Sequence, residues 1–554
     1  MPSEPRVRGP FRTDERARAA YAEAAGIYRI LPHAVCLPAD IDDLLTLVRW
    51  AADERVALVP RGAGSAMGGG NIGDGVMVDL TRMSGPTTEV RPERRRARMR
   101  AGASLGELDT AATAHALRLP PDPSSWRWAT AGGVVSTNAA GARSARYGSV
   151  RRWVEGLTFV TADAEVGSLS RGRRSQSQPQ VALPEAVLRF ERETAAAIET
   201  ARDLVGTRYP RIRKSSSGYA LDAYLRSGDA LDLVIGSEGT LVLVTEVEWR
   251  LDRVPAHRAG LRLLLKSYDT IEELVTRLVA LGASAVELLD RTFLELVAAH
   301  SKEPAGRAGI EAVLLVELES SDPEVLREAT SAAVTAGRQL AYEVDAALSP
   351  EGAARLWQLR HAASPILAGL PPDRRSLQVI EDGCVPVPRL GEYIMTIRQA
   401  AAARGLSVVI FGHAGDGNVH VNLLPELARP GWERDVAELL EEITDAVISL
   451  GGAPSGEHGD GRLRAGFLER LYGTEIVELF RRIKTSFDPL GLLNPGIILP
   501  SGEPPISRLK AGAGAIPLPE DIARALRDIE QSGGYAKSRL EIADSPADSP
   551  ADSR

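Results

Sequence analysis

Three glycine-rich segments, each next to a run of β-forming residues, constrain the fold of this chain most strongly. The first, RGAGSAMGGGN from Arg61 to Asn71, follows the apolar run VALVP. The second runs from Pro120 to Val150, and the third, LVIGSEGTLVLVTEVEWRL, runs from Leu233 to Leu251. Glycine lets successive N–H groups point into one concavity and lets a ligand approach the main chain closely. Three such segments in one chain indicate a binding surface made of loops, not glycines placed for packing alone.

The first loop by itself leaves two interpretations open, a phosphate-binding loop and an ordinary glycine-rich turn. Its spacing is not GxGxxG and no helical pattern begins inside it, so a Rossmann-type dinucleotide site is not predicted. The second segment favours a cofactor, because small residues let a flat ring system and its side chain lie against the backbone. These small residues are Ala131, Gly132, Gly133, Ser136, Ala139, Ala140 and Gly141.

The composition indicates a large protein with several buried cores. The 554 residues are 44% hydrophobic, enough for roughly three to four domain-sized units. The net charge of -8 gives no electrostatic reason to expect nucleic acid or an anionic membrane as a partner. The N-terminus lacks the apolar region of a signal peptide, and no run of about 18 apolar residues could span a bilayer. Cys36 and Cys384 are too distant to indicate a disulfide framework. We therefore expect a cytoplasmic protein, peripheral at a membrane only through a partner.

Hydrophobic periodicity divides the rest of the chain. The segment from Ile41 to Asp53 has helical spacing, and from about Leu261 to Leu424 strand-like runs alternate with helical patterns, which predicts a second, α+β domain. The basic run RPERRRARMR, Arg91 to Arg100, alternates in polarity and is interpreted as a solvated strand rather than a basic binding patch. The polar stretch Ser170 to Gln180 predicts a surface loop. The chain beyond Pro500 is rich in proline and glycine and is predicted to be disordered.

A histidine-containing hairpin is the second chemical feature. The segment FGHAGDGNVHVN, Phe411 to Asn422, predicts a β-hairpin with a two-residue turn at Asp416-Gly417. In that register His413 lies opposite His420, with Cβ atoms about 5 Å apart, so the two imidazoles could share a metal ion. Asn422 is expected on the same face. Two ordinary hydrogen-bonded surface histidines are the alternative.

The segment SGEHGDGR, Ser455 to Arg462, supplies a further carboxylate and imidazole. Glu457 and His458 are adjacent, so a loop can direct one toward a metal and the other toward a reacting group. The segment LWQLRHAAS contains Arg360, which taken alone would be an ordinary surface arginine on a helix.

The glycine-rich segments resemble the FAD-binding domain of the vanillyl-alcohol oxidase/p-cresol methylhydroxylase (PCMH) superfamily, in its D-lactate dehydrogenase/glycolate oxidase branch. The resemblance extends over roughly residues 20 to 500 and is to the iron–sulfur fusion type without its iron–sulfur domain. It implies an α+β fold, with a PCMH-type FAD-binding domain of two subdomains, an α+β cap domain for the substrate, and a C-terminal segment that returns to the flavin. The expected parts are a lead-in (1–35), the FAD-binding domain (36–252), the cap (253–450), the C-terminal segment (451–500) and a tail (501–554).

The resemblance assigns residues of each segment to FAD. The RGAG loop is expected to bind the pyrophosphate, the PDPSS to YG block to line the flavin, and the SEGTL segment and the motif IKTSFDPLGLLNPGII to complete the site. The FAD contacts that it implies are Arg61, Gly62, Ala63, Gly64, Ser65, Pro121, Asp122, Ser124, Gly132, Gly133, Asn138, Gly141, Tyr147, Gly148, Glu238, Gly239, Val244 and Asn494. Some superfamily members attach FAD to a histidine of the first loop. Because residues 61–71 contain no histidine, we expect noncovalent FAD.

The resemblance also implies a metal site and a reaction. His413, His420 and Glu457 are the implied ligands of a divalent metal, zinc or manganese. His458 is the implied catalytic base, and Arg360 and Asn422 complete the catalytic set. The implied reaction is oxidation of a small D-2-hydroxy acid, D-lactate or glycolate, to the 2-oxo acid. Relatives that act on longer diacids carry a lysine shortly after the arginine, but this chain reads LQVIEDGC there, so no second carboxylate is expected in the substrate.

The electron acceptor stays open at this point. Longer relatives continue into a cysteine-rich iron–sulfur domain, and the segment Asp521 to Arg539 resembles its entry without the cysteines. Electrons from FAD are therefore expected to pass to oxygen, to a quinone or cytochrome, or to a separate iron–sulfur protein. Two alternatives remain for the function. One is an oxidase of the same fold that acts on an aromatic or sugar alcohol and needs no metal. The other is a flavoprotein subunit of a glycolate oxidase-like complex.

Overall fold

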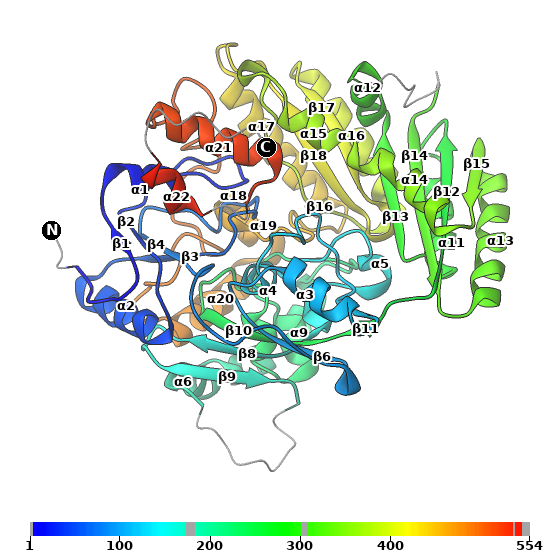
Figure 1. The fold of residues 1–554 in the computed structure, drawn as a ribbon. Helices are drawn as coiled ribbons and strands as arrows, with labels where there is room; N and C mark the ends of the chain where they lie inside the picture. The colour runs from blue at the N-terminus through cyan, green and yellow to red at the C-terminus, as the bar shows by residue number, and fades with distance from the viewer. Residues whose placement is uncertain (1–3, 173–182, 301–308, 536–537, 546–554) are drawn as a thin grey trace.

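The structure is a computed structural model, and it describes residues 4–172, 183–300, 309–535 and 538–545. The described strands form sheets of four, five, two and seven strands. The smaller sheets belong to the amino-terminal half, and the seven-stranded sheet belongs to residues 257–424 (Figure 1). Most of the polar loop that the sequence predicts over 170–180 lies outside the described residues. The mixture of helix and sheet confirms the α+β prediction.

The first sheet has the order β1-β2-β4-β3, and its last three strands pair in parallel. Parallel strands need a crossover, and helix α2 connects β2 to β3, the two strands on either side of β4. Asp40 caps the start of α2 by accepting from the N–H groups of Asp42 and Asp43. As predicted, helix and strand lead into the glycine-rich loop that begins at Arg61. The elements are β1 (Phe11–Arg12), α1 (Glu15–Ala20), β2 (Ala34–Cys36), α2 (Ile41–Glu54), β3 (Leu58–Arg61) and β4 (Val76–Asp79).

The second sheet is antiparallel, in the order β5-β6-β10-β8-β9. Its strand β6 lies in the basic run, and the prediction of a solvated strand is confirmed. Arg96 and Arg98 pair with Glu248 and Glu246 of β10 at 3.0 and 2.5 Å, so the neighbouring strand neutralises them. The strands are β5 (Glu89–Arg91), β6 (Arg96–Arg100), β8 (Val154–Val160), β9 (Val166–Ser170) and β10 (Leu243–Arg250).

Short helices connect these strands and place the glycine-rich segments. The third segment begins in a helix rather than in a strand, because Leu233 and Val234 end α10, and its strand starts only at Leu243. A two-stranded sheet of β7 and β11 lies at the end of this half. The elements are α3 (Leu105–Thr113), β7 (Leu117–Arg118), α4 (Ala131–Thr137), α5 (Ser144–Tyr147), α6 (Glu185–Glu193), α7 (Ala195–Thr200), α8 (Arg202–Arg208), α9 (Leu221–Ser227), α10 (Leu231–Val234) and β11 (Asp252–Arg253).

The cap is an antiparallel sheet in the order β15-β12-β14-β13-β17-β18-β16. Helices α11, α13, α16 and α17 pack on one face, where Leu261 and Leu288 are buried. Helices α12, α14 and α15 cover part of the other face around Leu289 and Val409, and the rest of that face turns toward the amino-terminal half. The elements are β12 (His257–Leu265), α11 (Ile271–Ala280), β13 (Ala285–Asp290), α12 (Arg291–His300), β14 (Ala312–Ser320), α13 (Pro323–Leu340), β15 (Glu343–Ala347), α14 (Pro350–His361), α15 (Ala363–Ala368), β16 (Gly383–Cys384), α16 (Leu390–Ala403), β17 (Ser407–His413), β18 (Asn418–Leu424) and α17 (Trp432–Ser449).

The histidine hairpin forms with a different register from the predicted one. His413 pairs with Asn418, and Phe411 pairs with His420, so the predicted two-residue turn and the direct pairing of the histidines are wrong. The loop is longer because Asp416 turns inward, where it is 1% exposed and accepts a hydrogen bond from Ser144 at 2.7 Å. The register is offset by two residues, which keeps each side chain on its face. The two imidazole centroids therefore still lie 5.0 Å apart.

After the cap, the chain returns to the first sheet. Leu493 forms a parallel bridge with Leu58 of β3, and the N–H of Asn494 donates to the oxygen of Leu58 at 2.8 Å. No helix in the described ranges is both long and apolar enough to cross a bilayer. The helices of this part are α18 (Gly461–Arg464), α19 (Leu468–Tyr472) and α20 (Thr474–Phe487).

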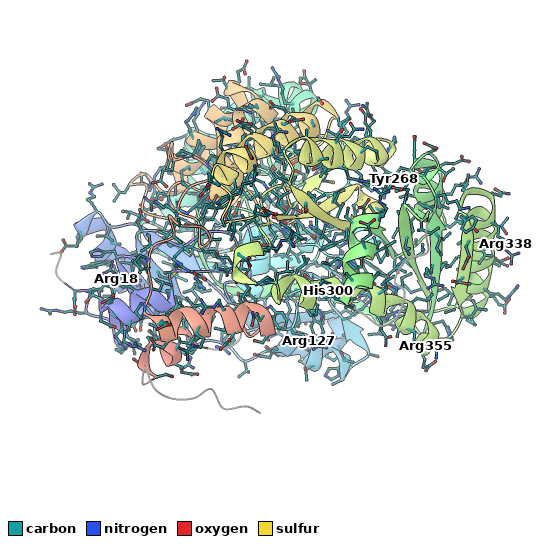
Figure 2. All side chains as sticks on the ribbon, turned by 90° about the horizontal axis from the view of Figure 1, so that it is seen from above. Arg18, Arg127, Tyr268, His300, Arg338 and Arg355 are labelled. Atoms are coloured by element: carbon teal, nitrogen blue, oxygen red, sulfur yellow. The ribbon has the colours of Figure 1, made fainter. Side chains whose placement is uncertain are left out.

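The prediction of a disordered tail is wrong for the described residues beyond 500. Helices α21 (Glu520–Ser532) and α22 (Arg539–Asp544) pack against α1, and their buried side chains share a core with it. Composition hid the apolar residues Ile522, Leu526 and Ile529, whose spacing is helical. Helix α21 also reaches α15 of the cap, and in the view from above it runs from the N-terminal helices toward the cap (Figure 2). Residues 546–554, most of the terminal repeat, lie outside the described residues.

We expect Leu526→Ala to lower the free energy of unfolding by about 2–4 kcal/mol, because it removes a buried leucine side chain. Leu526 is 4% exposed in the core shared by α1, α21 and α22. Chemical denaturation followed by circular dichroism measures the change. Arg527→Ala, at an exposed position of the same helix, is the matched control and should stay within about 0.5 kcal/mol. An effect of Leu526→Ala no larger than that of the control would contradict the packing of α21.

Candidate functional site

A cavity of about 540 Å³ lies between the amino-terminal sheets and the cap sheet. All three glycine-rich segments line it, and the cap contributes side chains from β13, β17, β18 and α14. The expected FAD contacts on its wall are Arg61, Gly62, Ala63, Gly64, Ser65, Asp122, Ser124, Gly132, Gly133, Glu238, Gly239 and Val244. The wall thus joins segments that lie nearly 200 positions apart in the sequence.

The other expected FAD contacts do not line this cavity, and some of them support its wall. Asn494 donates from Nδ2 to the backbone oxygens of Gly70 and Glu238 at 2.7 Å each, which ties the first glycine-rich segment to the third. The hydroxyl of Tyr147 donates to Glu319 of the cap at 2.6 Å. The structure places outside the cavity wall Pro121, Asn138, Gly141, Tyr147, Gly148 and Asn494.

The first glycine-rich loop has the donors that a diphosphate needs. The N–H groups of residues 63–66 donate to no group among the described residues. Backbone N–H groups that are shielded from water need an acceptor. Gly64 has a φ of 81°, which glycine adopts without strain. The guanidinium of Arg61 lies directly behind it, because a Cβ on Gly64 would lie 2.5 Å from Arg61 Nη2. This loop therefore fits the diphosphate of a dinucleotide cofactor.

Two histidines of the cap hairpin and one carboxylate converge at the cap side of the cavity. Nε2 of His413 lies 3.0 Å from Oε1 of Glu457, and Nε2 of His420 lies 3.3 Å from the same oxygen. All three side chains are at least nine-tenths buried. The structure therefore brings together the three metal ligands that the sequence suggests, although the hairpin register is not the expected one.

The other ring nitrogen of each histidine is anchored. Nδ1 of His413 lies 2.5 Å from Oε1 of Glu287, and Nδ1 of His420 lies 2.8 Å from the backbone oxygen of Glu381. Anchoring Nδ1 fixes the ring and leaves Nε2 as the coordinating atom, as in many metal sites. The donor set of two imidazoles and one carboxylate fits a divalent metal with coordination positions left open.

His458 lies beside the two hairpin histidines and is more open to the cavity. Its side chain is 28% exposed, against 6% for His413 and 9% for His420. Glu381 anchors Nδ1 at 2.5 Å, so Nε2 is free to face a ligand. The ring is stacked on that of His420 with centroids 5.1 Å apart. This arrangement suits a proton acceptor more than a metal ligand.

A second group of side chains is also close enough to hold a metal, with ligand atoms within 4.8 Å of one another: Asp382, His420, Glu457 and His458. Asp382, however, is already engaged. Its Oδ2 accepts from the N–H groups of Glu457 and His458 at 3.0 and 2.8 Å, and from the hydroxyl of Ser455 at 2.8 Å. Asp382 therefore holds the EHG loop in place, and the hairpin histidines with Glu457 are the better metal set.

The charges around the cluster favour a cation. Burial lowers the pKa of His413, but the carboxylates of Glu287 and Glu457 together outweigh burial and raise the pKa to about 9. In the same way Glu381, Asp382 and Glu457 together outweigh burial and raise the pKa of His458 to about 9. Burial lowers the pKa of His420. The negative charge of the carboxylates is thus partly balanced by protons on His413 and His458. A metal ion that binds Nε2 of His413 must displace the proton from that nitrogen.

Arg360 points into the cavity from α14. Its Nε lies 2.6 Å from Oε2 of Glu287, and its guanidinium lies 4.7 Å from the ring centroid of Phe411. The side chain is only 12% exposed, which excludes an ordinary surface arginine. Its Nη groups have no partner among the described residues, so they are available to a carboxylate.

Asn422 lies on the same wall. Its Oδ1 accepts from the hydroxyl of Ser376 at 3.0 Å and from Nε2 of Gln378 at 3.2 Å. These two bonds orient the amide and leave Nδ2 as a donor. The cavity wall is therefore polar and uncharged at Asn422 and Gln378.

Several charged residues of the site were not predicted from the sequence. Glu381 and Asp382 belong to the segment LQVIEDGC, in which only the missing lysine led to a prediction. Glu287 is a carboxylate inside the apolar strand AVELLD, and that position was a usable signal. Lys214, whose Nζ lies 2.9 Å from Oε2 of Glu457, stands in a segment without any distinguishing pattern.

Comparisons with known proteins agree with the fold and its two main parts. Residues 32–170 match the family of the FAD binding domain, and residues 254–498 match that of the C-terminal domain of FAD linked oxidases. The D-lactate dehydrogenase of Archaeoglobus fulgidus is 30% identical over 472 residues, 84% of this chain and 91% of that protein. The glycolate oxidase subunit GlcD of Bacillus subtilis is 28% identical over 496 residues, 88% of this chain and 94% of that protein.

Solved structures show the same fold at lower identity. The 4-ethylphenol oxidase from Gulosibacter chungangensis matches with a TM-score of 0.65 at 15% identity, covering 89% of this chain and 94% of that one. This likeness carries the fold alone.

Proposed function

The chain belongs to the family of FAD-linked oxidases, and on that premise we propose that it oxidises a small D-2-hydroxy acid, D-lactate or glycolate, to the 2-oxo acid with noncovalently bound FAD. The observation that carries the proposal is the convergence, on one cavity wall, of Arg360 with the cluster of His413, His420, Glu457 and His458. A 2-hydroxy acid offers a carboxylate to the first and a neighbouring hydroxyl to the second.

The chain's own residues supply binding and proton transfer. The Nη groups of Arg360 hold the substrate carboxylate, and Glu287 keeps the guanidinium in place through Nε. His458 takes the hydroxyl proton at Nε2 in its neutral form, whose population grows as the pH approaches its raised pKa of about 9, while Glu381 holds its Nδ1. The donor Nδ2 of Asn422 orients the substrate. The glycine-rich wall of residues 61–65, Gly132, Gly133 and Gly239 would hold FAD, which would supply the acceptor for the hydride of the α-carbon.

His413, His420 and Glu457 would hold the divalent metal through Nε2, Nε2 and Oε1. A bound zinc or manganese ion would lower the pKa of the substrate hydroxyl, which eases the loss of its proton. Competing alcohol oxidases of the same fold need no such site, so the anchored donor set favours a hydroxy acid over an aromatic or sugar alcohol.

A small substrate is favoured by the charges of the wall. Among the described residues that line the cavity near Arg360, Asn422 and Gln378 are neutral amides, and His361 has a pKa lowered by burial. Arg143 also lines the cavity, but Asp122 and Glu317 hold its guanidinium, so a second, distal carboxylate would have no unpaired permanent cation among these residues. This supports a monocarboxylate such as D-lactate or glycolate.

Electron transfer out of the site is the second part of the proposal. Two cysteines in the chain are too few to ligate an iron–sulfur cluster. The similarity to a glycolate oxidase subunit supports a role as the flavoprotein subunit of a complex in which a separate iron–sulfur protein accepts the electrons.

Anaerobic bleaching of the flavin tests the proposed reaction. We expect D-lactate or glycolate to bleach the flavin absorbance near roughly 450 nm, and L-lactate and both enantiomers of 2-hydroxyglutarate to bleach it much more slowly. The physical reason is that the hydroxyl, the α-hydrogen and the carboxylate must reach the base, the flavin and Arg360 together. Bleaching by an aromatic alcohol but by none of these acids would contradict the proposal.

The variant His458→Ala tests the assignment of the base. We expect the purified variant to retain its FAD, and single-turnover reduction of the flavin to slow by about 10²–10⁴-fold. Acid precipitation of the protein should release the FAD into the supernatant, because the cofactor is bound noncovalently. His300→Ala is the matched control, because His300 is exposed at the end of α12 and does not line the cavity. Reduction by His458→Ala at the control's rate would remove His458 from the mechanism, and flavin that stays with the precipitate would contradict noncovalent binding.

A further inference from the structure

Lys214 lies buried behind the histidine cluster, in the loop between α8 and α9. Its residue is 4% exposed, and its Nζ lies 2.9 Å from Oε2 of Glu457. It does not line the cavity, so a substrate cannot reach it. The lysine therefore acts on the site through Glu457.

The two oxygens of Glu457 have separate roles. Oε2 receives the ammonium of Lys214 and the N–H of Gly141, the latter at 2.5 Å. Oε1 faces Nε2 of His413 and of His420. With Oε2 held by two donors, only Oε1 can reach a cation placed between the histidines.

The ammonium also changes the charge that a metal would experience. Two neutral imidazoles and one carboxylate give a donor set with a single negative charge, and a cation 2.9 Å from that carboxylate offsets it. Because the carboxylate would neutralise less of the metal's charge, the metal would attract a ligand at its open positions more strongly. The same cation reduces the affinity of the site for the metal.

The ion pair is not needed to hold the two segments together. The N–H and hydroxyl of Ser216 donate to the oxygens of Ser455 and Gly456 at 3.0 and 3.2 Å. The N–H of Gly218 donates to Asp460 at 2.6 Å. These bonds dock the segment of Lys214 on the EHG loop, and none of them involves the lysine side chain.

We propose that Lys214 is a positioning residue, which keeps Glu457 a one-oxygen ligand so that a divalent metal would retain an open position for the hydroxyl of the substrate. This inference rests on the proposed function. It names a residue that no sequence pattern indicated.

The test replaces Lys214 in the full chain loaded with FAD. In Lys214→Met, Oε2 loses its cation, so Glu457 can use both oxygens. We expect Zn²⁺, measured by competition with a chelator, to bind at least about 10-fold more tightly, and the KM for the hydroxy acid to rise with FAD content unchanged. Co²⁺ in place of the native metal should show weaker visible absorption beyond the flavin band, as the coordination number increases. Lys214→Arg keeps the charge and should restore the wild-type values to within a few fold.

Lys510→Met is the matched control, because it removes another buried lysine, paired with Glu530 at 3.1 Å in the tail. Zn²⁺ affinity and Co²⁺ absorption of Lys214→Met equal to those of wild type and of this control would overturn the inference and leave the proposed function standing. If Lys214→Met fails to retain FAD, Lys214→Gln, neutral and of similar length, decides by the same two readouts. A wild-type protein that binds neither Zn²⁺ nor Co²⁺ would overturn both the inference and the metal site of the proposed function.

Discussion

The site depends on the contacts that stabilise the buried carboxylate of Glu457. A buried charge without partners costs several kcal/mol, so the chain must bring compensating groups to it. Those groups come from distant segments: Gly141 in the second glycine-rich segment, Lys214 after α8, and the hairpin histidines His413 and His420. Satisfying this one carboxylate therefore fixes the cap hairpin against the FAD-binding half, and the cavity is the space enclosed between them.

A layer of further carboxylates gives each imidazole its role. Glu287 pairs with both His413 and Arg360, so one side chain positions a proposed metal ligand and the arginine proposed to bind the substrate carboxylate. Glu381 holds His458 and also pairs with Arg464 at 2.5 Å. Nδ1 is the anchored atom in all three histidines of the cluster, and Nε2 is the functional one. In the proposed function the same chemical group thus serves as ligand or base according to its exposure and its neighbours.

Features of the fold and the site that depend on neighbouring residues could be predicted from the sequence, and features that depend on tertiary contacts could not. Glycine spacing and strand patterning predicted the lining segments, since these depend on neighbouring residues. The hairpin register was wrong, because the inward turn of Asp416 depends on Ser144, far away in sequence, but an offset of two kept both histidines on one face. The prediction of a disordered tail was wrong because it rested on the average composition, which obscured the helical spacing of three apolar residues in α21. Lys214 and Glu381 were missed because only tertiary contacts pair them with the EHG loop.

Metal content tests the central claim most directly. Elemental analysis of the dialysed, FAD-loaded protein should find about one zinc or manganese ion per chain, as expected for a site of two imidazoles and a carboxylate. Glu457→Gln should lose most of that metal, because the amide replaces the one anionic ligand. A wild-type protein that contains no divalent metal, yet is reduced rapidly and fully by D-lactate or glycolate, would contradict the account.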